Sequence, residues 1–255
     1  MQGKFGWLVK LLLCLMPLWV FGQKPTAPKP LTGLVLILDP GHGGEDPGSH
    51  GKFQGENVYE APYTLDQAYR IKYFAEQAGA KVYMTVYSEK VGGHRNWSAS
   101  KILPLERDVY FSLGDQQVKA GRGGLERRVD YANKVTKKQK NAQVVFLAIH
   151  FDIAAEDSRG AFIITPKEYT PTVAGYLVKA LDNLASTRPL RPAGHDGRKN
   201  IQILRSKNVV HEKVLIELGN FKNAHDNFTI RNYETRNRFA IRLVNALVKF
   251  HQVRE

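Results

Sequence analysis

One stretch decides how this chain folds: Leu36-Ile37-Leu38-Asp39-Pro40-Gly41-His42-Gly43-Gly44. Its first residues continue an apolar run that is typical of a buried strand, and the run stops abruptly at Asp39-Pro40-Gly41. His42 therefore follows the carboxyl end of a strand, which is where open α/β sheets bind their ligands. The glycines beside it let the backbone turn tightly and leave the imidazole uncrowded. His42 is the first candidate functional residue.

Outward from this stretch, strand patterns alternate with helix patterns. Strands are expected at 33–39, 81–86, 144–149, 160–165 and 213–218, with a further short one at 201–204. Helices are expected at 61–78, 125–138, 172–186 and 232–251, where apolar residues recur at three- and four-residue spacing. The alternation predicts βαβ units and an α/β fold, in which one domain has a mostly parallel, twisted sheet flanked by helices on both faces.

The segment 87–124 breaks this rhythm. It contains glycine pairs, a tryptophan, a proline and scattered charges, with at most a short helix at 105–113. Loops of this length are usually functional or disordered. We interpret 87–124 as a long insertion within the domain.

The N-terminal residues have the pattern of an export signal. Lys4 and Lys10 precede an apolar run at 11–21, which is shorter than the roughly 20 residues of a membrane span. We expect a signal peptide at 1–22, a proline-rich tether at 23–31 and the folded domain at 32–255. Cys14 is the only cysteine and lies in the expected signal, so no disulfide is predicted.

The charge of the chain favours an anionic partner. The formal net charge is +13, and the two lysines of the expected signal account for two of these charges. A basic surface suits a cell-wall polymer, a membrane surface or nucleic acid, and an export signal argues against nucleic acid. We expect an exported protein of the periplasm or cell envelope of a bacterium. The oligomeric state is not settled by the sequence.

Chemistry-bearing residues fall where the predicted strands end. His42, His150 and Glu217 each end a strand, and the carboxyl ends of parallel strands meet at one edge of the sheet. Glu60 opens the first helix at the same edge, although Glu56 competes for that role. Two histidines and one carboxylate are the ligands of a catalytic zinc, and a further carboxylate can act as general base. Each residue alone could equally be structural.

These residues lie in motifs that resemble the zinc-dependent N-acetylmuramoyl-L-alanine amidase family. The resemblance covers about 33–251 and includes five motifs in the family's order. They are Leu38 to Gly48, Glu60 through Gly79-Ala80-Lys81-Val82, Leu125-Glu126-Arg127-Arg128 with Ala132-Asn133, Ala148-Ile149-His150, and Ile216 to Asn223.

The resemblance implies a function and a role for each candidate. One zinc ion per chain would be bound by His42, Glu60 and His150, with Glu217 as the catalytic carboxylate. The position of Glu60 relative to Gly79-Ala80-Lys81-Val82 favours it over Glu56. The implied reaction is hydrolysis of the amide between N-acetylmuramic acid and L-alanine in peptidoglycan. Two other functions stay open: a non-catalytic peptidoglycan-binding module, and a zinc peptidase that cuts within the stem peptide.

The chain departs from the family pattern at two places. Asp152 stands where the family usually has asparagine, two residues after the second histidine. The insertion 87–124 is longer than usual, and in some relatives an inserted segment occludes the zinc until a partner displaces it. We therefore expect a possible activator protein that acts on 87–124.

Two further expectations concern charged neighbours of these motifs. Asp39 is expected to orient His42 at the turn. Arg122, Arg127 and Arg128 are expected to form a solvated basic face, which could also meet carboxylates of the stem peptide.

Overall fold

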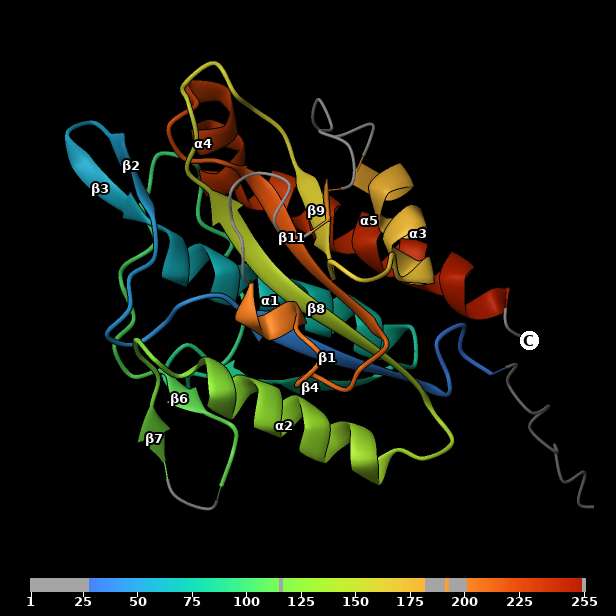
Figure 1. The fold of residues 1–255 in the computed structure, drawn as a ribbon. Helices are drawn as coiled ribbons and strands as arrows, with labels where there is room; N and C mark the ends of the chain where they lie inside the picture. Colours follow the sequence, from blue (N-terminus) through green and yellow to red (C-terminus); the bar gives the residue numbers. More distant parts are fainter. Residues whose placement is uncertain (1–27, 115–116, 182–190, 193–200, 254–255) are drawn as a thin grey trace, which may run out of the picture.

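A six-stranded sheet forms the centre of the molecule, in the order β10-β9-β11-β8-β1-β4 (Figure 1). The computed structural model describes residues 28–114, 117–181, 191–192 and 201–253. The strands of the sheet are β1 (Leu34–Pro40), β4 (Lys81–Met84), β8 (Gln143–Asp152), β9 (Phe162–Thr165), β10 (Arg191–Pro192) and β11 (Glu212–Asn220). Five of the predicted strands are therefore present: β1, β4 and β9 lie close to their expected limits, and β8 and β11 run two or three residues further than expected.

The sheet is mostly parallel, as predicted. β1 pairs in parallel with β4 and β8, and β8 pairs in parallel with β11. β9 is the exception, because it runs antiparallel to β11. The carboxyl ends of β1, β8 and β11 consequently lie at one edge, with His150 directly opposite Glu217 in the β8–β11 register.

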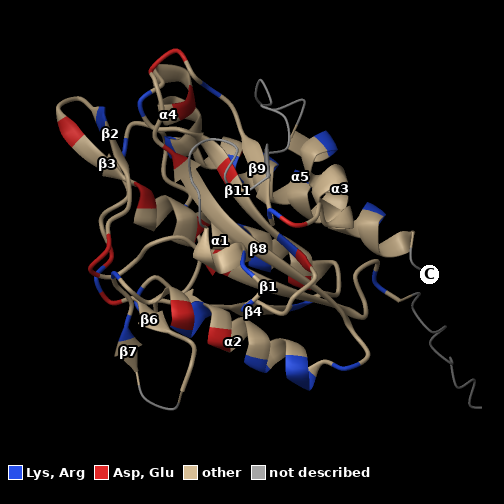
Figure 2. Ribbon diagram, in the orientation of Figure 1, with Lys and Arg blue, Asp and Glu red and all other residues tan. Residues whose placement is uncertain are grey.

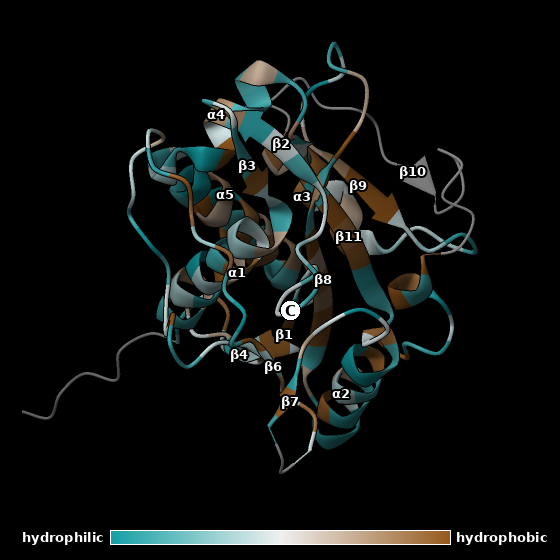
Figure 3. Ribbon diagram, turned by 90° about the vertical axis from the view of Figure 1, so that its left-hand side faces the viewer, coloured by the Kyte–Doolittle hydropathy of each residue, from teal (hydrophilic) through white to brown (hydrophobic). Residues whose placement is uncertain are grey.

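Helices cover both faces of this sheet, as expected for an α/β fold (Figure 1). One apolar cluster joins the sheet to α1 (Glu60–Gln77), α3 (Thr172–Leu181) and α5 (Tyr233–Gln252). A second cluster joins the other face to α2 (Leu125–Lys138) and the 3-10 helix η1 (Gln202–Leu204). Figure 3 shows the apolar strands β8, β9 and β11 enclosed by these more polar helices, which is how the chain hides its apolar runs from water.

The last predicted helix, 232–251, is present as α5, and one further helix precedes it. α4 (Ala224–Arg231) precedes α5 and was not expected from the sequence. Asn223 caps α4, and its side chain accepts from the backbone N–H groups of His225 and Asp226. Asn232 caps α5 in the same way. Basic residues close α2 and α5, where the helix dipole favours positive charge (Figure 2).

Smaller elements replace two predictions that are wrong. The strand expected at 201–204 is the 3-10 helix η1, and the short helix expected at 105–113 is absent from the described residues. The insertion instead contributes β5 (Val86–Tyr87), β6 (Tyr110–Phe111) and β7 (Val118–Lys119), which form an antiparallel sheet. The hairpin of β2 (His50–Phe53) and β3 (Glu56–Tyr59) precedes α1.

The expected signal peptide and most of the tether lie outside the described residues, as does the part of the predicted helix 172–186 beyond Leu181. Among the helices that the structure describes, none combines the length and apolar character needed to cross a membrane.

Candidate metal centre

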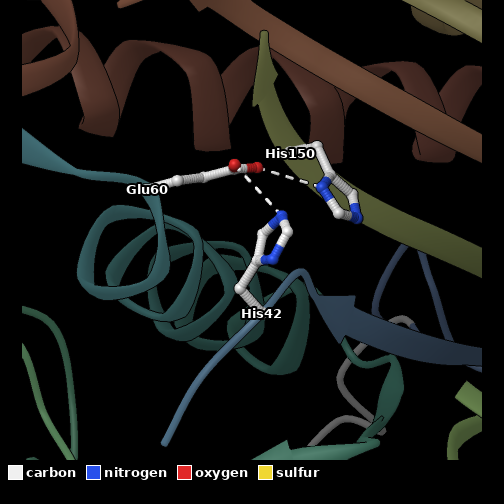
Figure 4. Close-up of side chains that lie close together, drawn as sticks. All are labelled: His42, Glu60 and His150. Carbon is white, nitrogen blue, oxygen red and sulfur yellow. Dashed lines mark hydrogen bonds and ion pairs between the residues drawn. The ribbon is translucent and has the colours of Figure 1, made fainter. Parts of the chain in front are cut away.

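Three side chains converge at the carboxyl edge of the sheet (Figure 4). His42 comes from the loop after β1, Glu60 is the first residue of α1, and His150 lies on β8. His42 Nε2 is 3.1 Å from Glu60 Oε2, and His150 Nδ1 is 3.0 Å from Glu60 Oε1. One ligand atom from each residue lies within 4.8 Å of the others. The three residues predicted as metal ligands are thus brought together, whereas the competing Glu56 is exposed at the start of β3.

Glu60 is held in place by hydrogen bonds from two other segments. The backbone N–H of Ser49 donates to Oε2 over 2.9 Å, and the Ser49 hydroxyl donates to the same oxygen over 2.8 Å. The backbone N–H of Phe151 donates to Oε1 over 3.0 Å. The side chain is only 2% exposed. Glu60 is therefore a fixed carboxylate whose remaining lone pairs face the two imidazoles.

Arg128 fixes the backbone that carries His42. His42 has φ of 63°, a left-handed conformation that costs most residues about 1–3 kcal/mol. The Arg128 guanidinium donates to Asp39 Oδ1 over 2.7 Å, to the Pro40 carbonyl over 2.6 Å and to the His42 carbonyl. The expectation that Arg128 belongs to a solvated face is wrong, because it is 4% exposed and bound to this turn. Arg122 and Arg127 are exposed as expected.

The carboxylate that touches the His42 ring is Asp46. Asp46 Oδ2 is 2.9 Å from His42 Nδ1, so a proton on Nδ1 leaves Nε2 to face Glu60. Asp39 was expected to orient His42, but its carboxylate binds Arg128 and the Thr85 hydroxyl and acts only through the arginine. Asp46 was not predicted from the sequence, although a carboxylate four residues beyond the histidine was the available signal.

Two glycines keep the centre clear of other side chains. A Cβ at Gly48 would lie 2.7 Å from the His42 ring and 2.8 Å from Glu60 Oε2. A Cβ at Gly41 would overlap the ring of His150. Only glycine fits at these two positions. Because neither position carries a side chain, the three candidate ligand residues can approach one another.

The electrostatics of the cluster favour a positive charge beside the buried carboxylate of Glu60. Burial by itself would lower the pKa of His42, but Glu60 and Asp46 outweigh it and raise the pKa to about 9. Burial would raise the pKa of Glu60, yet its contacts with His150 and His42 bring that pKa well below its usual range. A proton on His42 thus balances the buried carboxylate. Two imidazole nitrogens and one carboxylate oxygen are also the donor set that zinc prefers, so the residues fit this ion.

The predicted catalytic residue Glu217 lies beside the cluster. It is opposite His150 in the β8–β11 register and is 3% exposed. Residues that are opposite in register point to the same face of a sheet, so Glu217 and His150 share one face. Asp152, two residues after His150, is 8% exposed, and its carboxylate accepts from the backbone N–H of Ile153 over 2.8 Å.

A cavity of about 390 Å³ opens next to the cluster on the α2 side of the sheet. His42, His150, Asp46 and Arg128 line it together with η1. The end of the insertion, 121–124, forms another wall, and Ala120 accepts a backbone hydrogen bond from Glu45 in the His42 loop over 3.2 Å. The insertion therefore builds part of the cavity beside the candidate metal ligands.

A family model and several known proteins match most of this chain. A model of the N-acetylmuramoyl-L-alanine amidase family matches residues 36–249. The probable cell wall amidase LytH of Staphylococcus epidermidis is 26% identical over 206 residues, which is 80% of this chain and 53% of that protein. The germination-specific N-acetylmuramoyl-L-alanine amidase of Bacillus subtilis is 35% identical over 120 residues, 43% of this chain and 48% of that one. This chain thus spans about half the length of these relatives.

Solved structures share the fold. The N-acetylmuramoyl-L-alanine amidase AmiC2 of Nostoc punctiforme superposes with a TM-score of 0.60 at 21% identity, over 87% of this chain and 99% of that one. The CwlD amidase of Clostridioides difficile, solved in complex with the GerS lipoprotein, has a TM-score of 0.59 at 20% identity, over 86% and 98% of the two chains. At these identities the likeness establishes the architecture alone.

Proposed function

Because the chain belongs to the N-acetylmuramoyl-L-alanine amidase family, we propose that it hydrolyses the amide bond between N-acetylmuramic acid and L-alanine in peptidoglycan. The observation that carries this proposal is the convergence of His42, Glu60 and His150 within 4.8 Å at the edge of the sheet. The cavity beside them gives a substrate access to that point.

The proposed cofactor is one zinc ion per chain, held by His42, Glu60 and His150. When bound, zinc polarises the scissile carbonyl and makes the attacking water acidic near neutral pH. The protein's part is to hold the ligands in place. Asp46 orients the His42 ring, while Ser49 and Phe151 hold the carboxylate of Glu60. Arg128 keeps the backbone of His42 in its left-handed conformation.

Glu217 is the proposed general base. Its position opposite His150 puts a carboxylate on the sheet face that carries this proposed zinc ligand. Because Glu217 is buried, its carboxylate exchanges protons with a reactant more readily than with bulk water. Glu217 would accept a proton from the attacking water and donate it to the departing amine of L-alanine. Arg122, on the cavity wall, is available to meet a carboxylate of the substrate.

Digestion of purified peptidoglycan tests the reaction. We expect intact stem peptides to be released from the glycan, release to stop when a chelator is added, and release to return with zinc. Mass analysis of the products is the measurement. Fragments of stem peptide would identify a peptidase instead, and binding to peptidoglycan without cleavage would identify a wall-binding module.

The substitution Glu217→Gln tests the general base. We expect zinc content to stay the same and turnover to fall by roughly 10²–10⁴-fold, the usual contribution of a positioned base. Glu168→Gln, at an exposed glutamate, is the matched control and should keep full activity. A Glu217→Gln enzyme with a near-normal rate would reject the assignment.

We also propose that the protein is exported to the cell envelope and that a partner acts on its insertion. GerS bound to CwlD is the precedent for a partner of this fold. On the insertion, Trp97 is 37% exposed, with Arg95 and Lys101 over its ring, which is the composition of a protein-binding surface. Trp97→Ala should leave the activity of the isolated protein unchanged and abolish stimulation in cells. Unchanged wall lysis in cells would reject this surface.

A further inference from the structure

A second cavity, of about 720 Å³, lies between the β2–β3 hairpin and α4. Figures 1 and 3 both place this hairpin beside α4. The cavity shares no lining residue with the first one. Residues that line it include His50, Lys52, Phe53, Ile153, Phe221 and Arg231. Neither the proposed zinc ligands nor the general base belongs to it, so it needs a separate explanation.

Arg231 is a buried cation at this cavity. It is 5% exposed, and its guanidinium carbon lies 3.4 Å from the centre of the Phe53 ring. Its Nε donates to Asn227 Oδ1 over 2.9 Å, whereas its Nη1 is buried and has no hydrogen-bond partner among the described residues. Burial lowers the pKa of Arg231. A buried charge is costly without a counterion, and none pairs with Arg231 among the described residues, so an anion in the cavity that this residue lines is favoured.

The other charged residues around the cavity strengthen its preference for anions. Lys52 and Lys222 line it and are exposed, against the single acidic residue Glu156. Ile153, which is 43% exposed, and Phe221 add apolar surface. Cationic groups above an apolar floor suit a carboxylate carried on an aliphatic peptide, since a guanidinium binds a carboxylate through a planar pair of donors.

This cavity is joined to the candidate metal centre through the residues that hold Glu60. Ser49 donates to Glu60, and the next residue, His50, lines the second cavity. Phe151 also donates to Glu60, and its ring packs 5.6 Å from that of Phe221. Segments 49–50 and 151–153 thus border both the candidate metal centre and the second cavity.

We propose that the second cavity is a subsite for a carboxylate of the stem peptide, and that Arg231 determines the preference for a free carboxylate over an amide. The identity of the peptide rests on the proposed amidase function. The recognition itself rests on the buried guanidinium of Arg231, whose hydrogen-bonding capacity is not filled by the described residues, and on the basic lining of the cavity.

Calorimetric binding of a stem tetrapeptide to the full-length protein tests this subsite without turnover. The probes are one peptide with all carboxyls free and the same peptide with all carboxyls amidated. We expect the free acid to bind roughly ten- to a hundredfold more tightly, which is the usual effect of a charged hydrogen bond. Arg231→Gln should remove most of that difference. Arg238→Gln, which loses the same charge at an exposed position of α5, should keep it.

Turnover supplies the second measurement. With muramyl peptides as substrates, Arg231→Gln should raise KM for the free acid by about ten- to a hundredfold and leave kcat nearly unchanged. If this variant fails to fold, Lys52→Gln combined with Lys222→Gln, both at exposed positions, should lower the preference about two- to threefold.

The outcomes separate this inference from the proposed function. Equal binding of acid and amide by the unsubstituted protein, or a preference that survives Arg231→Gln, would overturn the subsite. Selective binding of the free acid without any cleavage would instead reject the amidase reaction and leave the subsite standing.

Discussion

Two buried carboxylates on α1, six residues apart, have opposite surroundings. Glu60 is 2% exposed and lies between the imidazoles of His42 and His150. Asp66 is 3% exposed and lies between two guanidinium groups, with Arg70 Nε and Arg236 Nε each 2.7 Å from its Oδ2. Both carboxylates are almost completely enclosed by protein. Only the chemistry of their partners differs.

That difference decides which carboxylate can bind a metal. An imidazole can release its proton and offer a lone pair to a cation, whereas a guanidinium keeps its protons and has no lone pair to offer. Asp66 therefore has a structural role, because it connects α1 to the insertion and to α5. The backbone N–H of Arg95, in the insertion, donates to its Oδ1 over 2.6 Å, and Arg236 brings α5 to the same point. Glu60 remains available for chemistry because its partners can change protonation.

The largest expected effect is the loss of Glu60 as a ligand. In Glu60→Gln we expect zinc to fall from about one ion per chain to a small fraction of that. Activity should fall by about a thousandfold or more, because the stabilisation that a bound metal gives is worth several kcal/mol. Metal analysis and muropeptide digestion are the measurements. Glu56→Gln, at the exposed competitor, is the control, and full zinc content in Glu60→Gln would contradict the ligand set.

The next effect concerns Asp66 and should appear in stability. Asp66→Asn leaves two buried arginines without a counterion, which typically costs about 3–5 kcal/mol of unfolding free energy. The folded fraction should still bind zinc, because no ligand has changed. Urea unfolding with zinc analysis measures both. Asp130→Asn, at an exposed aspartate of α2, should be neutral, and an equally neutral Asp66→Asn would show that the two carboxylates are not distinguished as described.

A smaller effect is expected at Asp46. Asp46→Asn keeps all three ligands but removes the charged acceptor from His42 Nδ1. Zinc affinity should weaken by about 10- to 100-fold, as is usual for a residue that orients a ligand. Competition with a chelating dye measures it. Glu45→Gln, at the neighbouring exposed carboxylate, should bind zinc normally; the same affinity in both variants would argue against the role of Asp46.

The smallest effect is a pH dependence that only the metal-free protein should have. His42 has a pKa of about 9, raised above its ordinary value of 6.5. The stability that its proton provides is complete below about pH 6.5 and is lost as the pH rises through about 9. Chelator-treated protein should therefore unfold at lower urea concentration at pH 9 than at pH 6.5. His42→Asn should lose this particular dependence, and an unchanged slope in that variant would assign it to another group.

The sequence predicted the residues of the metal centre better than their supports. His42 and His150 follow short apolar runs that favour strands, and the family resemblance that links Glu60 to Gly79-Ala80-Lys81-Val82 favoured Glu60 over Glu56. Arg128 was wrongly predicted to be solvated. Helical spacing shows on which side of a helix a residue lies, but it does not show that the residue binds a turn far away in the chain. Its position in the first turn of α2 was the available signal.

The fold shows the same limit. Apolar periodicity identified the strand at β9, but it carries no information on strand direction, so the antiparallel pairing with β11 was not predicted. The β2–β3 hairpin was missed because its short strands are polar and only partly buried. The second cavity depends on that hairpin, so Arg231 could not have been recognised as more than a residue near the end of a helix.

Arg128 contacts both the insertion and the backbone of His42, and so connects the insertion to the candidate metal centre. α2 begins at Leu125, directly after the insertion, and Arg128 lies in its first turn with the insertion's Phe111 ring 5.8 Å from its guanidinium. The same guanidinium holds the His42 carbonyl. A displacement of the insertion would therefore reach His42 through the Arg128 side chain, which connects the segment proposed to bind a partner with a proposed zinc ligand.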